Sequence, residues 1–199
     1  EKILNIKINI IGFDTGTGLP NSHLKQDLPY FWKHGDYRNN NLKDLEKEDN
    51  SIKIYEGNIS STIDKYILEN KSKIGLIFFD LDLYSSTKLF LDKIEELSQN
   101  KLLLPRVFCY FDDLFVADYT LNDINGEPLA IEEFNAQSKN IKLGKTFDHI
   151  TDFKFPLAKG QIYTLHDFEN EDYNKYIGIY SPNSLSSKNN EKFRSLIDD

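Results

Sequence analysis

The sequence predicts an α/β fold built on an open, mostly parallel and twisted sheet. Apolar runs rich in β-branched and aromatic residues alternate with segments whose apolar residues recur at helical spacing. Such alternation is typical of strand–helix–strand units, in which successive strands lie parallel. Near the C-terminus, two strand-like runs (147–155 and 160–168) follow one another closely, which predicts an antiparallel hairpin at the end of the chain.

The remaining elements follow from the same patterns. The predicted strands are 6–13, 51–57, 74–80 and 106–113, and the predicted helices are 60–70, 85–97 and 128–137. Ser61, followed three residues later by Asp64, resembles a capping box at the start of the first helix. Residues 21–50 are polar with a few aromatics and predict a surface excursion. We therefore expect one domain over 1–180 and a polar, flexible tail over 181–199.

Composition excludes several classes of function. With 24 basic and 32 acidic residues the net charge is −8, so we expect no nucleic-acid partner, which would need a basic face. No apolar run reaches the roughly 20 residues of a membrane span, and no signal peptide is recognisable, which predicts a cytoplasmic protein. The single cysteine, Cys109, is expected to be a buried thiol. The sequence leaves the oligomeric state open, a homo-oligomer included.

Two predicted strands end in paired carboxylates. Asp80 and Asp82 follow the apolar run 76–79, and Asp112 and Asp113 end the next strand, one strand–helix unit later. Parallel neighbours would bring these four groups to one crevice at the carboxyl edge of the sheet. Four carboxylates side by side need a cation or raised pKa values, and oxygen ligands favour Mg²⁺, Ca²⁺ or Mn²⁺. The alternative is that some of them cap the following helix or face solvent.

Three further residues lie at the ends of other predicted strands. Asp14 follows an early strand, where an acidic residue can accept hydrogen bonds from ribose hydroxyls; an Asx-turn into the glycine-containing loop would explain it equally. Gly57 and Asn58 lie at the end of the second strand, where a backbone can approach a flat ligand, although an ordinary strand-to-helix turn has the same composition.

Several stretches resemble one family in order. The stretches "GFDTGTGLP", "GNISSTI", "FFDLDLYSST", "YFDD", "GEPLAIEEFN" and "YTLHDF" resemble bacterial class I S-adenosylmethionine-dependent methyltransferases of the macrocin O-methyltransferase-like group. The resemblance spans roughly residues 11–170, and "DLDLYSST" followed by the Asp-Asp strand end is its most specific part.

The resemblance implies an O-methyltransferase that acts on a hydroxyl of a small molecule or sugar. It implies a Rossmann-like sheet with helices on both faces, S-adenosylmethionine across its carboxyl edge and a divalent metal, usually Mg²⁺. The implied metal ligands are Asp80, Asp112 and Asp113, and Asp82 is the implied general base. Asp14 would face the cofactor ribose, and Gly57 and Asn58 would lie near the adenine.

One part of the family pattern has no counterpart in these residues. The family's first strand and its glycine-rich loop should precede residues 6–13, where only a handful of residues stand. An upstream segment would supply them; without one, the chain would be a non-catalytic remnant domain. A D-x-D after an apolar strand also fits a metal-dependent nucleotide-sugar glycosyltransferase, and it resembles the nucleophile motif of haloacid-dehalogenase-like phosphatases.

Overall fold

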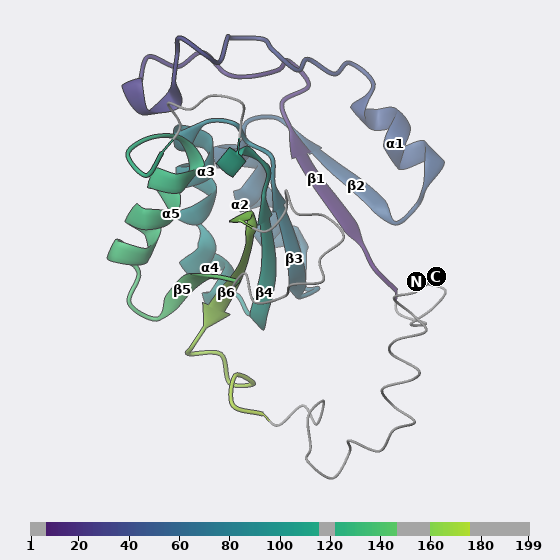
Figure 1. Ribbon diagram of the computed structural model, residues 1–199. Helices are drawn as coiled ribbons and strands as arrows, with labels where there is room; N and C mark the ends of the chain where they lie inside the picture. The colour runs from purple at the N-terminus through teal and green to yellow at the C-terminus, as the bar shows by residue number, and fades with distance from the viewer. Residues whose placement is uncertain (1–6, 116–121, 147–159, 176–199) are drawn as a thin grey trace, which may run out of the picture.

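Within the residues that the structure describes, the strands form two open sheets. The computed structural model describes residues 7–115, 122–146 and 160–175 (Figure 1). The strands are β1 (Ile10–Asp14), β2 (Ile52–Glu56), β3 (Ile74–Phe79), β4 (Leu103–Phe111), β5 (Ile141–Lys145) and β6 (Ile162–Asp167). The helices are α1 (Leu42–Glu48), α2 (Ile59–Glu69), α3 (Tyr84–Leu91), α4 (Ile94–Gln99) and α5 (Gly126–Gln137), with 3₁₀ turns η1 (Lys25–Asp27) and η2 (Asp112–Phe115). The architecture is mixed α/β with open sheets.

Parallel and antiparallel pairs both occur. β1 and β2 form a parallel two-stranded sheet, and the second sheet has the order β3-β4-β6-β5. β3 and β4 are parallel, as predicted, with Phe79 opposite Phe111 at their carboxyl ends. β6 pairs antiparallel with both β4 and β5. The predicted C-terminal hairpin thus has β6 as one strand, but its partner is β5, which the sequence analysis did not identify; the run 147–155 lies outside the described residues.

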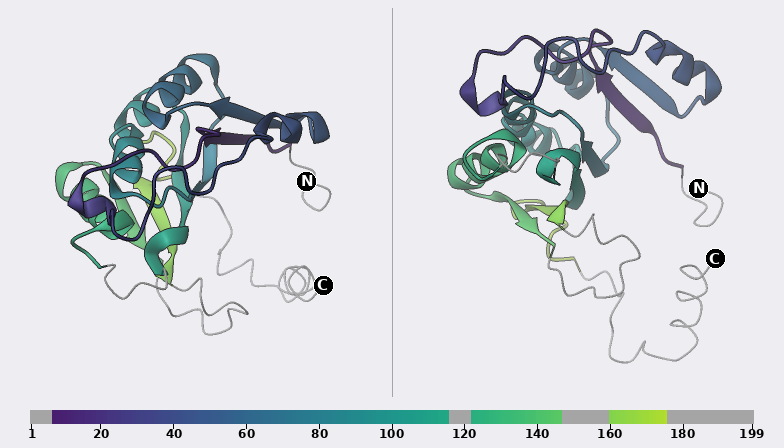
Figure 2. Two further views of the ribbon diagram at one scale, coloured as in Figure 1. Left: turned by 90° about the horizontal axis from the view of Figure 1, so that it is seen from above. Right: turned by 45° about the horizontal axis from the view of Figure 1, so that its top comes forward.

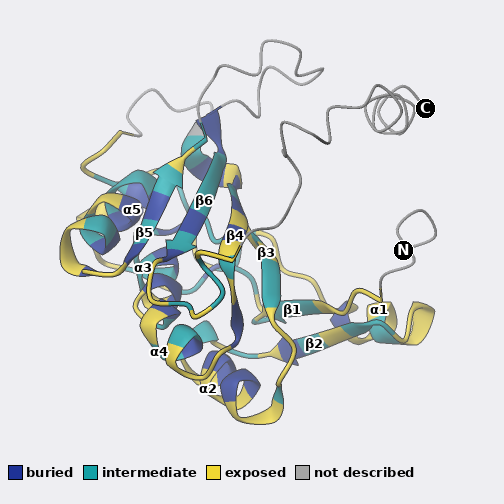
Figure 3. Cartoon of the chain, turned by 90° about the horizontal axis from the view of Figure 1, so that it is seen from below, coloured by how far each residue is buried: buried dark blue, intermediate teal, exposed yellow. Residues whose placement is uncertain are grey.

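The core lies between the four-stranded sheet and the helices. α3, α4 and α5 lie on one side of this sheet (Figures 1 and 2). Alternate strand residues, including Phe79 and Phe111, face these helices and are buried, and their rings stack with centroids 4.2 Å apart. Leu76, Phe78 and Phe108, which alternate with the buried residues, are exposed on the other face. Figure 3 shows how buried and exposed positions are distributed along the strands. This period of two is what a half-covered sheet requires. Cys109 is buried in this core, as predicted.

Several local expectations were wrong. The predicted helix 85–97 is divided into α3 and α4, because Asp92 and Lys93 end the first helix and begin the second. α2 begins at Ile59, one residue before the predicted helix, and its N-cap is Asn58, whose side chain accepts a hydrogen bond from the Ser60 amide. Ser61 therefore lies inside the helix. The polar excursion contains a helix, α1, that its composition did not reveal.

The two sheets meet at their carboxyl ends. Asp14 ends β1, Asp80 follows β3 and Asp112 follows β4, and all three line one cavity. Within the described residues, β1 pairs only with β2, and β3 pairs only with β4. Each of these two parallel strands therefore has an open edge. The cavity is shared between two separate sheets.

Candidate metal centre and cofactor cavity

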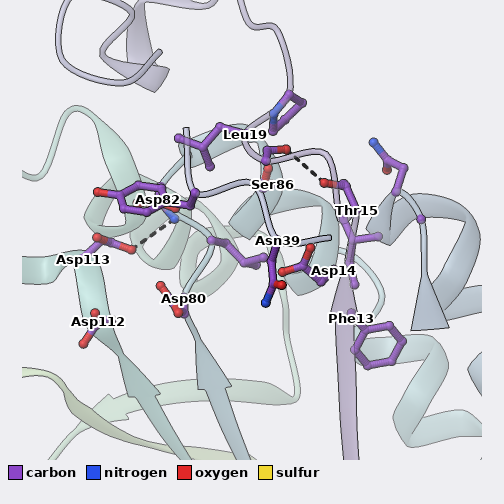
Figure 4. A pocket seen from close by; sticks show the side chains of 17 residues that line it. Phe13, Asp14, Thr15, Leu19, Asn39, Asp80, Asp82, Ser86, Asp112 and Asp113 are labelled. Carbon is purple, nitrogen blue, oxygen red and sulfur yellow. Dashed lines mark hydrogen bonds between the residues drawn. The ribbon is translucent and has the colours of Figure 1, made fainter. Parts of the chain in front are cut away.

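A cavity of about 420 Å³ opens at the carboxyl ends of β1, β3 and β4 (Figure 4). Its wall comes from four regions: the strand ends, the start of α2, the start of α3, and the excursion between β1 and α1. The lining residues are Phe13, Asp14, Thr15, Gly18, Leu19, Pro20, Tyr37, Asn39, Gly57, Asn58, Ile59, Asp80, Leu81, Asp82, Ser86, Asp112 and Asp113. Every residue that the sequence analysis singled out for metal, base or cofactor binding is in this set.

Three of the carboxylates gather tightly. Asp80, Asp82 and Asp113 each offer an oxygen, and these oxygens lie within 4.8 Å of one another. Asp80 lies directly after β3 and Asp113 at the start of η2, so the parallel pairing of β3 with β4 brings them together. A set of carboxylate oxygens of this kind suits a hard divalent cation such as Mg²⁺ or Ca²⁺. We call Asp80, Asp82 and Asp113 the carboxylate cluster.

Asp82 owes its position to an unusual turn. The Leu83 amide donates to the Leu81 carbonyl at 2.5 Å, which closes a three-residue turn around Asp82, and Asp82 has φ of 57°. Few residues other than glycine adopt a positive φ, although aspartate tolerates it better than most. The Asp82 amide donates to Oδ2 of Asp113 at 3.1 Å (Figure 4). One member of the cluster therefore holds the backbone of another.

Burial and mutual repulsion raise the pKa values in the cluster. Burial, followed by the charges of Asp113 and Asp80, raises the pKa of Asp82 to about 7. Burial likewise raises the pKa of Asp113 to about 6, against the lowering effect of the hydrogen bond from the Asp82 amide. The pKa of Asp80 is also raised, mainly by burial and by Asp112. Without a cation, these groups are harder to ionise than ordinary carboxyls, as closely spaced acids must be.

Asp112 lies outside the carboxylate cluster. It lines the same cavity, but its Oδ1 accepts a hydrogen bond from the Tyr110 hydroxyl at 2.8 Å, and its backbone carbonyl accepts from Gln161. Its side chain is exposed, whereas that of Asp113 is buried. The predicted ligand set of Asp80, Asp112 and Asp113 therefore differs from the set that the structure brings closest together, in which Asp82 replaces Asp112.

Sequence reasoning missed a buried carboxyl behind the cluster. Glu127, in the first turn of α5, is fully buried, and its Oε2 accepts the Asp113 amide at 3.2 Å. Burial, together with the neighbouring Asp113 charge, raises the pKa of Glu127 well above its usual range. An acidic residue in a first turn is ordinarily read as a partner of the helix dipole, so its sequence position gave no signal of this contact.

The residues at the ends of β1 and β2 have ordinary structural partners. Asp14 Oδ1 accepts the Gly16 amide at 2.6 Å, which is an Asx-turn. Asn58 caps α2 through its Oδ1, and Gly57 has φ of 139°, a conformation that favours glycine. All three line the same cavity as the carboxylate cluster, and the Asp14 charge is among the causes that raise the pKa of Asp80. Turn and helix-cap hydrogen bonds explain these three residues without a ligand. Because they also line the cavity, they are placed where they could contact a bound ligand as well.

The excursion is anchored over the cavity by another buried carboxylate. Asp27, in η1, accepts hydrogen bonds from the Ser85 amide and hydroxyl, both at 2.7 Å, and from the Ser22 hydroxyl. These contacts fix the excursion to the start of α3, since Ser85 is in its first turn. Farther along the excursion, Tyr37 lines the cavity, and burial followed by the Asp82 and Asp113 charges raises the pKa of its phenol.

Comparisons with protein-family models, curated proteins and solved structures give no significant match. Inferences about function therefore come from the sequence and the geometry of the cavity. Among the described residues, no helix is both long and apolar enough to cross a membrane.

Proposed function

We propose that the protein is an S-adenosylmethionine-dependent O-methyltransferase that uses a divalent cation, Mg²⁺ in the first instance, and acts on a hydroxyl of a small molecule or sugar. The observation that carries the proposal is the carboxylate cluster, three acidic side chains from two parallel strand ends with oxygens within 4.8 Å of one another. It lies in the same cavity as Asp14, Gly57 and Asn58, the residues for which the family resemblance implies cofactor contacts.

The donor set supports a cation. Carboxylates with raised pKa values repel one another, and a divalent cation would offset this repulsion by binding the ionised forms. In this proposal Asp80 and Asp113 hold the cation, and Asp112 stands beside them as the third ligand that the resemblance implies. The cation would lower the pKa of an acceptor hydroxyl, and the cofactor would supply the methyl group.

Asp82 is proposed as the general base. Its carboxylate shares the cluster with Asp80 and Asp113, so a hydroxyl held at the cation would lie within its reach. A pKa of about 7 in the absence of metal suits a group that accepts a proton near neutral pH. The turn around Asp82 and the hydrogen bond to Asp113 fix its direction before any ligand binds.

We also propose that the two sheets are parts of one Rossmann-like sheet with helices on both faces. The open edges of β1 and β3 support this, because one additional parallel strand between them would join the sheets. The family resemblance implies a first strand followed by a glycine-rich loop, and a loop at the carboxyl end of such a strand would reach the cavity. Asp14, Gly57 and Asn58 would then face the cofactor from its ribose and adenine side.

Calorimetric titration of S-adenosylhomocysteine into the full-length protein tests the proposal, once with Mg²⁺ and once with a chelator. We expect micromolar binding, followed by methyl transfer when hydroxyl acceptors are screened with Mg²⁺. Binding of a nucleoside diphosphate with Mn²⁺ and no binding of S-adenosylhomocysteine would contradict it in favour of a glycosyltransferase. A folded full-length protein that binds neither would be a non-catalytic domain.

A further inference from the structure

Glu127 is a carboxyl group in a position where an apolar side chain would be expected. It is fully buried, and the residues that share its helix face, Ala130, Ile131 and Phe134, belong to the core. Burying a carboxyl is costly unless its oxygens find hydrogen-bond donors. Such a residue needs a reason beyond packing, since a leucine of similar size would fill the space at lower cost.

The hydrogen bonds of Glu127 lead toward the cavity. Oε2 accepts the Asp113 amide at 3.2 Å, and Oε1 lies 3.4 Å from the Thr87 hydroxyl on α3. The Thr87 hydroxyl also donates to the Leu83 carbonyl at 3.0 Å, on the turn that follows Asp82. Glu127 is therefore connected to both strand ends that supply the carboxylate cluster, through Asp113 on one side and through Thr87 and Leu83 on the other.

The path continues to Asp82. Oδ2 of Asp113 accepts the Asp82 amide at 3.1 Å, and Asp82 has the positive φ that few side chains adopt (Figure 4). A backbone in this conformation persists when its surroundings hold it. The contacts around Asp113 and Leu83 supply that support, and Glu127 is the buried group in which they converge.

We infer that Glu127 is a positioning residue, which fixes Asp113 and, through it, Asp82 in the arrangement that a divalent cation requires. The inference rests on the proposed function only in taking a divalent cation as the ligand of the carboxylate cluster. The contacts themselves do not depend on it. Groups that orient the ligands of a metal commonly change its affinity 10–100-fold when they are removed.

Three variants separate positioning from packing. Glu127→Leu keeps the volume and removes the acceptor, whereas Glu127→Gln keeps an oxygen for the Asp113 amide and a polar group beside Thr87. Ile131→Ala, in the same helix and core, is the stability control, because Ile131 is buried but lies outside the hydrogen-bonded path. All three are measured in the full chain for unfolding midpoint, for the amide resonances of Asp82 and Asp113, and for Mn²⁺ affinity by electron paramagnetic resonance.

Glu127→Leu is expected to shift both amide resonances and to weaken Mn²⁺ binding about tenfold or more. Glu127→Gln should restore most of both properties, and Ile131→Ala should lower the midpoint without moving the two resonances. Resonances unchanged in Glu127→Leu, or moved equally by Ile131→Ala, would overturn the inference. If the wild-type protein bound no Mn²⁺, the metal part of the proposed function would fail, but the resonances would still decide whether Glu127 positions Asp113 and Asp82.

Discussion

The two halves of the cavity present polar groups at equivalent places and in different states. At the ends of β1 and β2, Asp14 and Asn58 have local partners within two residues along the chain. At the ends of β3 and β4, Asp82 and Asp113 contact one another across the fold and have raised pKa values. At the ends of β1 and β2, the polar side chains therefore stabilise a local turn or a helix start. At the ends of β3 and β4, the carboxyl groups repel one another and their pKa values are raised. Perturbed, crowded groups of the second kind are the stronger sign of function.

The largest effect is expected from Asp82→Asn. If Asp82 removes the hydroxyl proton, methyl transfer should fall by about 10²–10⁴-fold, while S-adenosylhomocysteine binding stays close to that of the wild type. Radiolabelled methyl transfer to an acceptor found by screening measures this. Full turnover in the variant would show that the base is another group and would weaken the contrast between the two halves.

The next largest effect concerns Asp27, a carboxylate whose hydrogen bonds are satisfied and which anchors the excursion. Asp27→Ala should lower the free energy of unfolding by about 1.5–3 kcal/mol, because the Ser85 amide loses a charged acceptor. Chemical denaturation gives the value, and Asp44→Ala, which removes an exposed acid of the first turn of α1 and its ion pair with Lys47, is the control. A loss no greater than that of the control would mean that the excursion is not held by Asp27.

The pH dependence of stability tests the state of the cluster directly. Because the folded-state pKa of Asp82 is about 7 and its ordinary value is 3.8, the folded protein retains a proton that the unfolded chain has lost. This contribution to stability is fully present below pH 4 and is lost as the pH rises to about 7. Metal-free protein should therefore lose thermal stability over this range, and Mg²⁺ at pH 8 should restore it.

Each of the variants Asp82→Asn and Asp113→Asn should reduce the dependence of the unfolding midpoint on pH, because it removes one titrating carboxyl group. We call this dependence the pH slope. Each kcal/mol recovered corresponds to about 2–4 °C in the unfolding midpoint for a chain of this size. Thermal scans without metal at several pH values measure the pH slope. If both variants kept the wild-type pH slope, the cluster would not carry the raised pKa values.

The smallest effect is expected in the other half of the cavity. Asn58→Ala should cost about 1 kcal/mol of stability, because the Ser60 amide loses its cap. Asn58→Ser keeps the cap and should restore the stability. If Asn58 also contacts the cofactor, Asn58→Ser will still bind S-adenosylhomocysteine more weakly than the wild type; unchanged binding would leave Asn58 as a helix cap alone.

The sequence predicted the parts of the fold that periodicity encodes. The apolar runs that became β3 and β4 and their parallel order were foreseen, and so was the meeting of their carboxylates. β5 was not predicted, because "IKLGK" is short and interrupted by Gly144. It forms a strand by pairing with β6. The roles of Glu127 and Asp27 were not predicted, because the local sequence of each is typical of an acidic residue at a helix start or in a loop. Their partners, Asp113 and Ser85, are distant in sequence and meet them only in the folded chain.

The central claim is tested most directly by measuring Mn²⁺ binding with electron paramagnetic resonance. The measurement is made on the wild type and on the variants Asp113→Asn and Asp112→Asn. We predict one site per chain that Mg²⁺ displaces. Asp113→Asn should weaken it at least about tenfold, or about 1.4 kcal/mol, and Asp112→Asn should weaken it less, because Asp112 lies outside the carboxylate cluster. Wild-type protein that binds Mn²⁺ no more tightly than Asp113→Asn would contradict the claim that the carboxylate cluster is a metal centre.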